Sequence, residues 1–95
     1  MLFHVKMTVR VPPDTDPDDL AELNEKEHSR AEELQRAGKW LHLWRVTGRF
    51  ENISVFRVDD PDELHEILSS LPLYPYMDVD VIALSRHPGA IAVSD

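Results

Sequence analysis

One carboxylate, Glu27, occupies a position where the helical pattern predicts an apolar residue. Leu20, Leu23, Ala31 and Leu34 recur around it at the spacing of one face of a helix. A carboxylate that faces a protein core loses hydration, which raises its pKa and suits it to act as a general base or acid near neutral pH. The structural alternative is that Glu27 pairs with an arginine of a neighbouring sheet, or lies at the edge of the apolar face. The residues alone leave both interpretations open.

Further candidates lie in segments that alternate as strands. Asn52 is an amide among apolar neighbours, where it needs hydrogen-bond partners and can hold a ligand carbonyl. Arg45 and Lys6 are candidate cations for a substrate carboxylate. Trp40 and Trp44 are large enough either to fill a core or an interface, or to form the wall of a ligand pocket.

Composition excludes several kinds of chemistry. The 95-residue chain has no cysteine, so thiol nucleophiles, disulfides and cysteine-ligated metals are excluded. Its 3 glycines form no phosphate-binding loop, and its 5 histidines lack metal-ligand spacing, so we expect neither a nucleotide cofactor nor a metal. A net charge of −8 argues against binding to nucleic acid or to an anionic membrane. Without a signal peptide or membrane span, a soluble cytoplasmic protein is expected.

The order of the predicted elements defines a fold class. Alternation and helical periodicity predict strand, helix, strand, strand, helix and strand at residues 2–11, 17–37, 39–48, 50–58, 61–71 and 76–85. This βαββαβ order is the α+β, ferredoxin-like sandwich, in which two helices cover one face of a four-stranded antiparallel sheet. We expect a single domain over residues 1–95, with 85–95 as a C-terminal arm. The other face of the sheet also carries apolar residues, which favours a homo-oligomer.

Several segments resemble the muconolactone delta-isomerase family. They are MLFHVKMTVRVP at 1–12, GKWLHLWRVTGRF at 38–50, NISVF at 52–56 and ELHEILSSLPLYPYMDVDV at 63–81. The resemblance implies the ferredoxin-like, dimeric α/β-barrel type of fold. It also implies a large ring-like homo-oligomer, typically a decamer built from dimers.

The resemblance further implies a reaction. In that family (+)-muconolactone becomes 3-oxoadipate enol-lactone in the β-ketoadipate pathway, through an allylic proton transfer that needs no cofactor. Glu27 would be the base and Asn52 a donor to the developing oxyanion. Arg45, Lys6 or His42 would bind the carboxylate of the lactone substrate.

Other functions remain as alternatives. Phe50 and Ile53 stand where tyrosines are familiar in the family, which predicts a more apolar pocket and resembles the 5-chloromuconolactone dehalogenase branch. Phe50 and Trp44 are expected to contact the substrate in either case. A cofactor-free, quinone-forming monooxygenase would use Trp40, Trp44 and Asn52 around a phenol. A ligand-binding module without catalysis is the non-enzymatic alternative.

Overall fold

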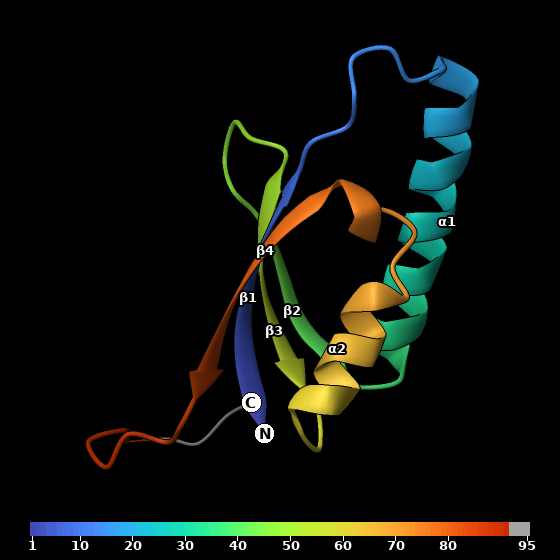
Figure 1. The fold of residues 1–95 in the computed structure, drawn as a ribbon. Helices are drawn as coiled ribbons and strands as arrows, with labels where there is room; N and C mark the ends of the chain where they lie inside the picture. Colours follow the sequence, from blue (N-terminus) through green and yellow to red (C-terminus); the bar gives the residue numbers. More distant parts are fainter. Residues whose placement is uncertain (92–95) are drawn as a thin grey trace.

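Four strands form one antiparallel sheet, and two helices cover one of its faces (Figure 1). The computed structural model describes residues 1–91. Its elements are β1 (Leu2–Val9), α1 (Pro17–Arg36), β2 (Trp40–Arg45), β3 (Glu51–Arg57), α2 (Pro61–Ser69), a short 3₁₀ helix (Tyr74–Tyr76) and β4 (Met77–Leu84). The sheet order is β2-β3-β1-β4. The predicted ferredoxin-like fold is confirmed.

Both helices begin at the predicted residues, 17 and 61, directly after an aspartate. The carboxylate of Asp16 accepts from the amides of Asp18 and Asp19 at 2.8 and 3.2 Å, and a proline follows it. Asp60 caps α2 in the same way, accepting from the Glu63 amide at 2.8 Å. These side chains satisfy amides that the first helical turn leaves without a carbonyl partner. The chain leaves α1 through Gly38, whose φ of 74° favours glycine.

The second and third strands are shorter than predicted because a turn separates them. Gly48 adopts a φ of 80°, and the Arg49 amide donates to the carbonyl of Val46 at 3.1 Å. The turn therefore takes residues 46–50 out of the strands. Its last residue, Phe50, is held beside β1 by a 3.0 Å hydrogen bond from the Val9 amide to the Phe50 carbonyl.

A bulge in β2 changes which side chains share a face. Trp40 lies opposite Phe56, whereas His42 lies opposite Val55, so the chain advances two residues on β2 for one on β3. Beyond the bulge the alternation is reversed. Leu43 and Arg45 therefore share a face with Trp40, and His42 and Trp44 lie on the other face. Simple alternation over the predicted strand at 39–48 places Trp40, His42 and Trp44 on one face, and the bulge shows that this placement is wrong.

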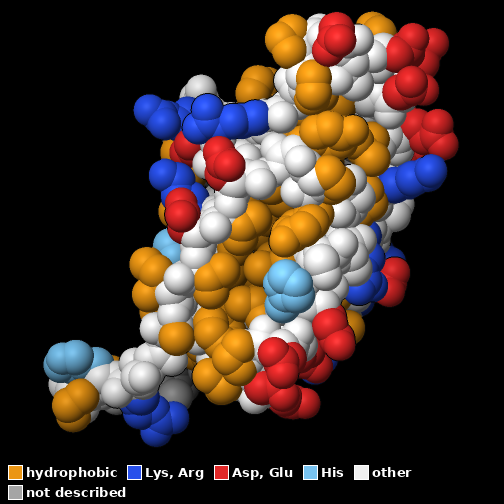
Figure 2. All heavy atoms as spheres, viewed as in Figure 1, with side chains coloured by type: hydrophobic (Ala, Val, Ile, Leu, Met, Phe, Trp, Pro, Cys, Tyr) orange, Lys and Arg blue, Asp and Glu red, His pale blue; other side chains and the backbone are white. Residues whose placement is uncertain are grey.

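The hydrophobic core lies between the helices and the sheet face that they cover. Phe3, Val5 and Met7 of β1 belong to one buried cluster with residues of both helices, and the rings of Trp40 and Phe56 pack at a centroid distance of 4.7 Å. Figure 2 shows hydrophobic side chains gathered between sheet and helices, with acidic side chains over the start of α1 at the upper right. The acidic side chains at the start of α1 thus lie outside the core.

The opposite face of the sheet, here called the outer face, is not covered by the chain itself. Trp44, Ile82 and Leu84 are 67%, 57% and 41% exposed. Residues 85–91 of the expected arm extend away from the sheet and are exposed (Figure 1), and residues 92–95 lie outside the described part. The single-domain boundary remains a prediction. Neither helix described here is long and apolar enough to cross a membrane.

Candidate active site

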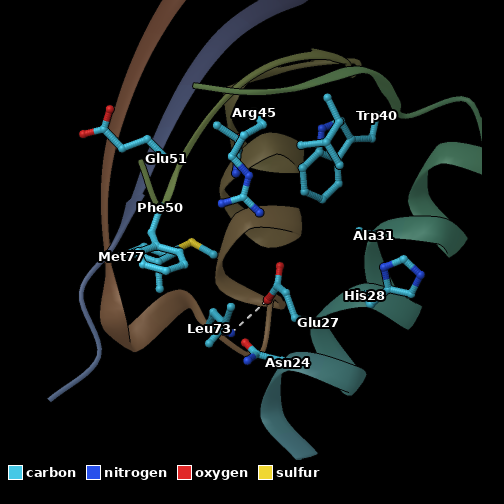
Figure 3. Close-up of a pocket in the computed structure, with 13 residues that line it drawn as sticks. Asn24, Glu27, His28, Ala31, Trp40, Arg45, Phe50, Glu51, Leu73 and Met77 are labelled. Atoms are coloured by element: carbon cyan, nitrogen blue, oxygen red, sulfur yellow. Dashed lines mark hydrogen bonds between the residues drawn. The ribbon is translucent and has the colours of Figure 1, made fainter. Parts of the chain in front are cut away.

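A cavity of about 530 Å³ lies between α1 and the helix-covered face of the sheet (Figure 3). Such a volume is within the range of small-molecule sites. Its walls come from α1, all four strands, the turn before β3 and the connector that leads into β4. They comprise Val9, Asn24, Glu27, His28, Ala31, Trp40, Leu43, Arg45, Phe50, Glu51, Asn52, Leu73 and Met77.

Glu27 projects from α1 into this cavity (Figure 3). The Leu73 amide donates to Oε1 of Glu27 at 2.9 Å. Burial raises the pKa of Glu27 above its ordinary value of 4.5, and the Leu73 hydrogen bond opposes that rise only in part. Within residues 1–91 the Glu27 carboxylate joins no ion pair. The structural alternative, in which Glu27 pairs with an arginine of the sheet, is therefore not what the structure shows. Such an environment suits a carboxylate to act as a general base.

The connector after α2 holds the Leu73 amide in place. Leu71 and Leu73 are buried, and the amides of Tyr74 and Tyr76 donate to their carbonyls at 2.9 Å each. Pro75 restricts the backbone between these two turns. Glu27 is thus anchored by a backbone segment that itself has little freedom.

Arg45 brings a cation to the same cavity. Its guanidinium points from β2 toward the Glu27 carboxylate in Figure 3. One guanidinium nitrogen, Nη1, donates to the carbonyl of Arg49 at 3.2 Å, which ties the side chain to the turn before β3. The remaining donors of the guanidinium fork can serve an anionic ligand. An acidic protein thereby presents a local positive charge.

Asn52 lies opposite Arg45 on β3 and lines the cavity. Its Oδ1 accepts from the hydroxyl of Ser54 at 2.7 Å. The amide NH₂ is therefore the part of the side chain left to donate to a ligand. The cavity thus combines a partly desolvated carboxylate, a guanidinium and an amide donor.

Three predicted binding residues lie elsewhere. Lys6, His42 and Trp44 are on the outer face. Lys6 and Trp44 flank Ile53, and His42 lies opposite Val55, and both of these β3 residues face outward. Lys6 is 3.8 Å from a carboxylate oxygen of Glu51. The bulge in β2 is the physical reason why His42 and Trp44 face outward while Trp40 faces the helices. The expectation that Ile53 makes the pocket more apolar is also wrong, because it too faces outward.

Phe50 and Trp40 form aromatic walls of the cavity. Phe50 lies at its rim and is 80% exposed. Trp40 is buried, and its indole Nε1 finds no hydrogen-bond partner among residues 1–91. A buried donor without a partner costs free energy. That cost is more readily tolerated beside a ligand site than in a sealed core.

Sequence reasoning missed several residues of the cavity. Asn24 lies one helical turn before Glu27, and its polarity on the same apolar face was an available signal. Leu43 and Met77 are apolar residues of strands, with nothing to distinguish them from core residues. Leu73 contributes a backbone amide, which leaves no trace in residue type. Within the described residues no cluster of three or more His, Asp or Glu side chains is suited to a metal ion.

Fold and cavity together define the class: an α+β, ferredoxin-like protein with an acid–base pocket between helix and sheet. The family model described as muconolactone delta-isomerase matches residues 1–90. Among curated relatives, muconolactone delta-isomerase 2 of Acinetobacter lwoffii is 53% identical, covering 100% of this chain and 99% of its own length. The chain belongs to the muconolactone delta-isomerase family.

Other comparisons agree with this assignment. The muconolactone delta-isomerase of Rhodococcus opacus is 50% identical over 86 residues, covering 90% of this chain and 92% of its own. A crystal structure of muconolactone isomerase superposes with a TM-score of 0.94 at 50% identity, covering 100% of this chain and 99% of the other. The resemblance in sequence is confirmed. These names support the isomerase rather than the dehalogenase alternative.

Proposed function

We propose that this protein is a muconolactone delta-isomerase, which converts (+)-muconolactone to 3-oxoadipate enol-lactone. The observation that carries the proposal is Glu27, a half-buried carboxylate anchored by the Leu73 amide in a cavity of about 530 Å³. Family membership supplies the substrate. The geometry supplies a reason why one side chain of this chain suits the reaction.

Glu27 serves as the single base of the proposed mechanism. Its carboxylate removes the proton from the ring carbon that bears the carboxymethyl arm. The electron pair moves through the alkene to the lactone carbonyl oxygen and gives a dienolate. Glu27, now protonated, returns the proton to the carbon alpha to the carbonyl, and the double bond ends in its new position. Atoms and electrons balance without an oxidant or reductant.

The Leu73 hydrogen bond selects the oxygen that moves the proton. Because Oε1 accepts from the backbone amide, Oε2 of Glu27 is the oxygen left for the substrate. The raised pKa brings the carboxylate closer in basicity to the carbon acid from which it removes the proton. Anchoring one oxygen also limits rotation of the carboxyl group between the two proton transfers.

Asn52 and Arg45 bind the two oxygen-bearing ends of the substrate in this proposal. The Asn52 NH₂ donates to the lactone carbonyl oxygen, where negative charge develops. Arg45 binds the carboxylate of the carboxymethyl arm. Phe50 packs at the open rim. Lys6, His42 and Trp44 are given no contact with substrate in this cavity, because they lie on the outer face.

The same proposal includes assembly into a homo-oligomer through the outer face. Trp44 on the edge strand β2 and Ile82 and Leu84 on the opposite edge strand β4 are exposed apolar side chains of that face, and burying them between copies is favourable. A decamer built from dimers is the assembly that the family resemblance implies. A cytoplasmic location is proposed on the cysteine-free composition, which suits a reducing compartment.

Turnover of the two candidate lactones by the purified protein tests the proposed function. Ultraviolet absorbance follows isomerisation of (+)-muconolactone, and chloride release from the 5-chloro lactone is measured in parallel. We expect isomerisation with kcat/KM well above that for chloride release. An unchanged spectrum with muconolactone would overturn the isomerase. Oxygen consumption with an anthrone-type phenol would instead support the monooxygenase.

A further inference from the structure

Ser54 is a fully buried polar residue beside the candidate active site. Its exposed fraction is 0%, and its neighbours across the sheet are Val5 on β1 and Leu43 on β2. Residues two apart on a strand project to the same face, so Ser54 and Asn52 both face the helices. The Ser54 hydroxyl donates to Oδ1 of Asn52 at 2.7 Å. A hydroxyl in an otherwise apolar environment needs that acceptor.

We propose that Ser54 is a positioning residue for the isomerase reaction: its hydroxyl fixes the orientation of the Asn52 amide so that the NH₂ group faces the substrate. The inference rests on the proposed function for its catalytic consequence. The orientation itself follows from the hydrogen-bond chemistry of the two side chains.

The alternative amide orientation leaves a buried donor unsatisfied. With the amide rotated by half a turn, the Asn52 NH₂ would donate to Ser54 Oγ, and the hydroxyl proton would lose its acceptor. Burial prevents water from replacing that acceptor, so the rotated state is disfavoured. The orientation recorded in the structure satisfies the hydroxyl and the amide oxygen together.

The orientation matters because the two ends of an amide have opposite polarity. An NH₂ group that faces the lactone carbonyl stabilises the negative charge of the dienolate. An amide oxygen in the same place would repel that charge. Ser54 therefore acts through Asn52 and does not touch the substrate.

A double-mutant cycle separates this role from a purely structural one. Ser54→Ala is made in the wild-type chain and in Asn52→Ala, and kcat and KM for muconolactone are measured in all four proteins. Loss of one oxyanion donor lowers kcat by about 100-fold, so we expect that loss for Asn52→Ala. Loss of one neutral hydrogen bond changes a rate by about two- to tenfold. Ser54→Ala should therefore lower kcat by that factor and leave KM nearly unchanged.

The decisive comparison is the effect of Ser54→Ala without Asn52. We expect no further loss of kcat in the Asn52→Ala background, since the group that Ser54 orients is gone. Val58→Ala, a truncation in the core away from the cavity, controls for loss of stability and is expected to keep wild-type kcat at a temperature where it is folded. Equal losses in both backgrounds, or wild-type kcat in Ser54→Ala, would overturn the proposal.

The amide orientation is also measurable without turnover. In NMR spectra of the wild-type protein, we expect weak cross-relaxation between the Asn52 amide protons and the Ser54 β protons, because the NH₂ points away. Strong cross-relaxation between them would overturn the proposed orientation. If the wild-type protein does not isomerise muconolactone while this NMR result holds, the proposed function fails and the orientation stands.

Discussion

Replacing Glu27 by glutamine removes the ionisable group and keeps the shape of the side chain. The amide oxygen of glutamine can still accept from Leu73, as Oε1 does at 2.9 Å in the wild-type protein. The substitution therefore separates proton transfer from the packing of α1 against the connector. The proposed substrate contacts of Arg45 and Asn52 also remain.

The expected loss is in kcat. A positioned general base contributes about 10²- to 10⁴-fold to a rate. Glu27 is asked to remove the proton and to return it, so we expect the upper end of that range, about 10⁴-fold or about 5 kcal/mol of activation free energy. Because the binding groups are retained, KM should change by less than about threefold.

The direction of the Glu27 pKa shift adds a pH signature. Since the carboxylate is the active form and its pKa is raised, wild-type kcat/KM should fall as pH drops through a value above 4.5. Over the same window the folded state binds more protons than the unfolded state, so stability falls as pH rises through it. At neutral pH, Glu27→Gln should therefore unfold at a temperature no lower than that of the wild-type protein.

The assay combines turnover of muconolactone with thermal unfolding across pH. A loss of kcat with unchanged KM and undiminished melting temperature supports Glu27 as the base. If Glu27→Gln keeps kcat within about tenfold of wild type, well short of what a base supplies, the reasoning from burial and the Leu73 contact is refuted. A large loss that accompanies unfolding would instead assign Glu27 a structural role.

Three further substitutions test other parts of the account. Arg45→Met should raise KM by about tenfold with little change in kcat, since a partly exposed charged hydrogen bond to the substrate carboxylate is lost; an unchanged KM would place that carboxylate elsewhere. Glu63→Gln should lower the melting temperature at neutral pH, and the difference from wild type should shrink as pH falls. The reason is that a backbone amide and a lysine hold the pKa of Glu63 below its ordinary value. Glu66→Gln is the matched control on α2. Trp44→Glu should reduce the mass of the assembly in sedimentation, whereas Ser29→Glu on the exposed side of α1 should not; a wild-type mass for Trp44→Glu would contradict assembly through the outer face.

The fold was predictable because local signals agree with the tertiary arrangement. Asp16 and Asp60 mark both helix starts, and each is followed by a proline in the first turn. Gly38 marks the exit from α1. The alternation of β1 matches its pairing with β3 and β4. Strand ends were less accurate, since the turn at Gly48 draws flanking residues out of both strands.

The site was predictable only in part. Glu27 is conspicuous because a charged residue interrupts an apolar helical face, and the structure places it in the cavity as that pattern indicated. The assignment of His42 and Trp44 failed because both faces of β2 are apolar in sequence, so nothing marks the bulge. The Leu73 contact was beyond prediction, since it joins residues 46 positions apart through a backbone amide.

The most direct test of the central claim is the fate of the transferred hydrogen in heavy water. If Glu27 alone removes and returns the proton in a partly desolvated cavity, product formed from muconolactone in deuterium oxide should retain some of the original hydrogen at the carbon alpha to the carbonyl. Mass spectrometry and NMR of the product after a single turnover measure that fraction. Measurable retention in the wild-type protein is the result we predict. Complete incorporation of solvent deuterium in every turnover would contradict a single shuttling carboxylate.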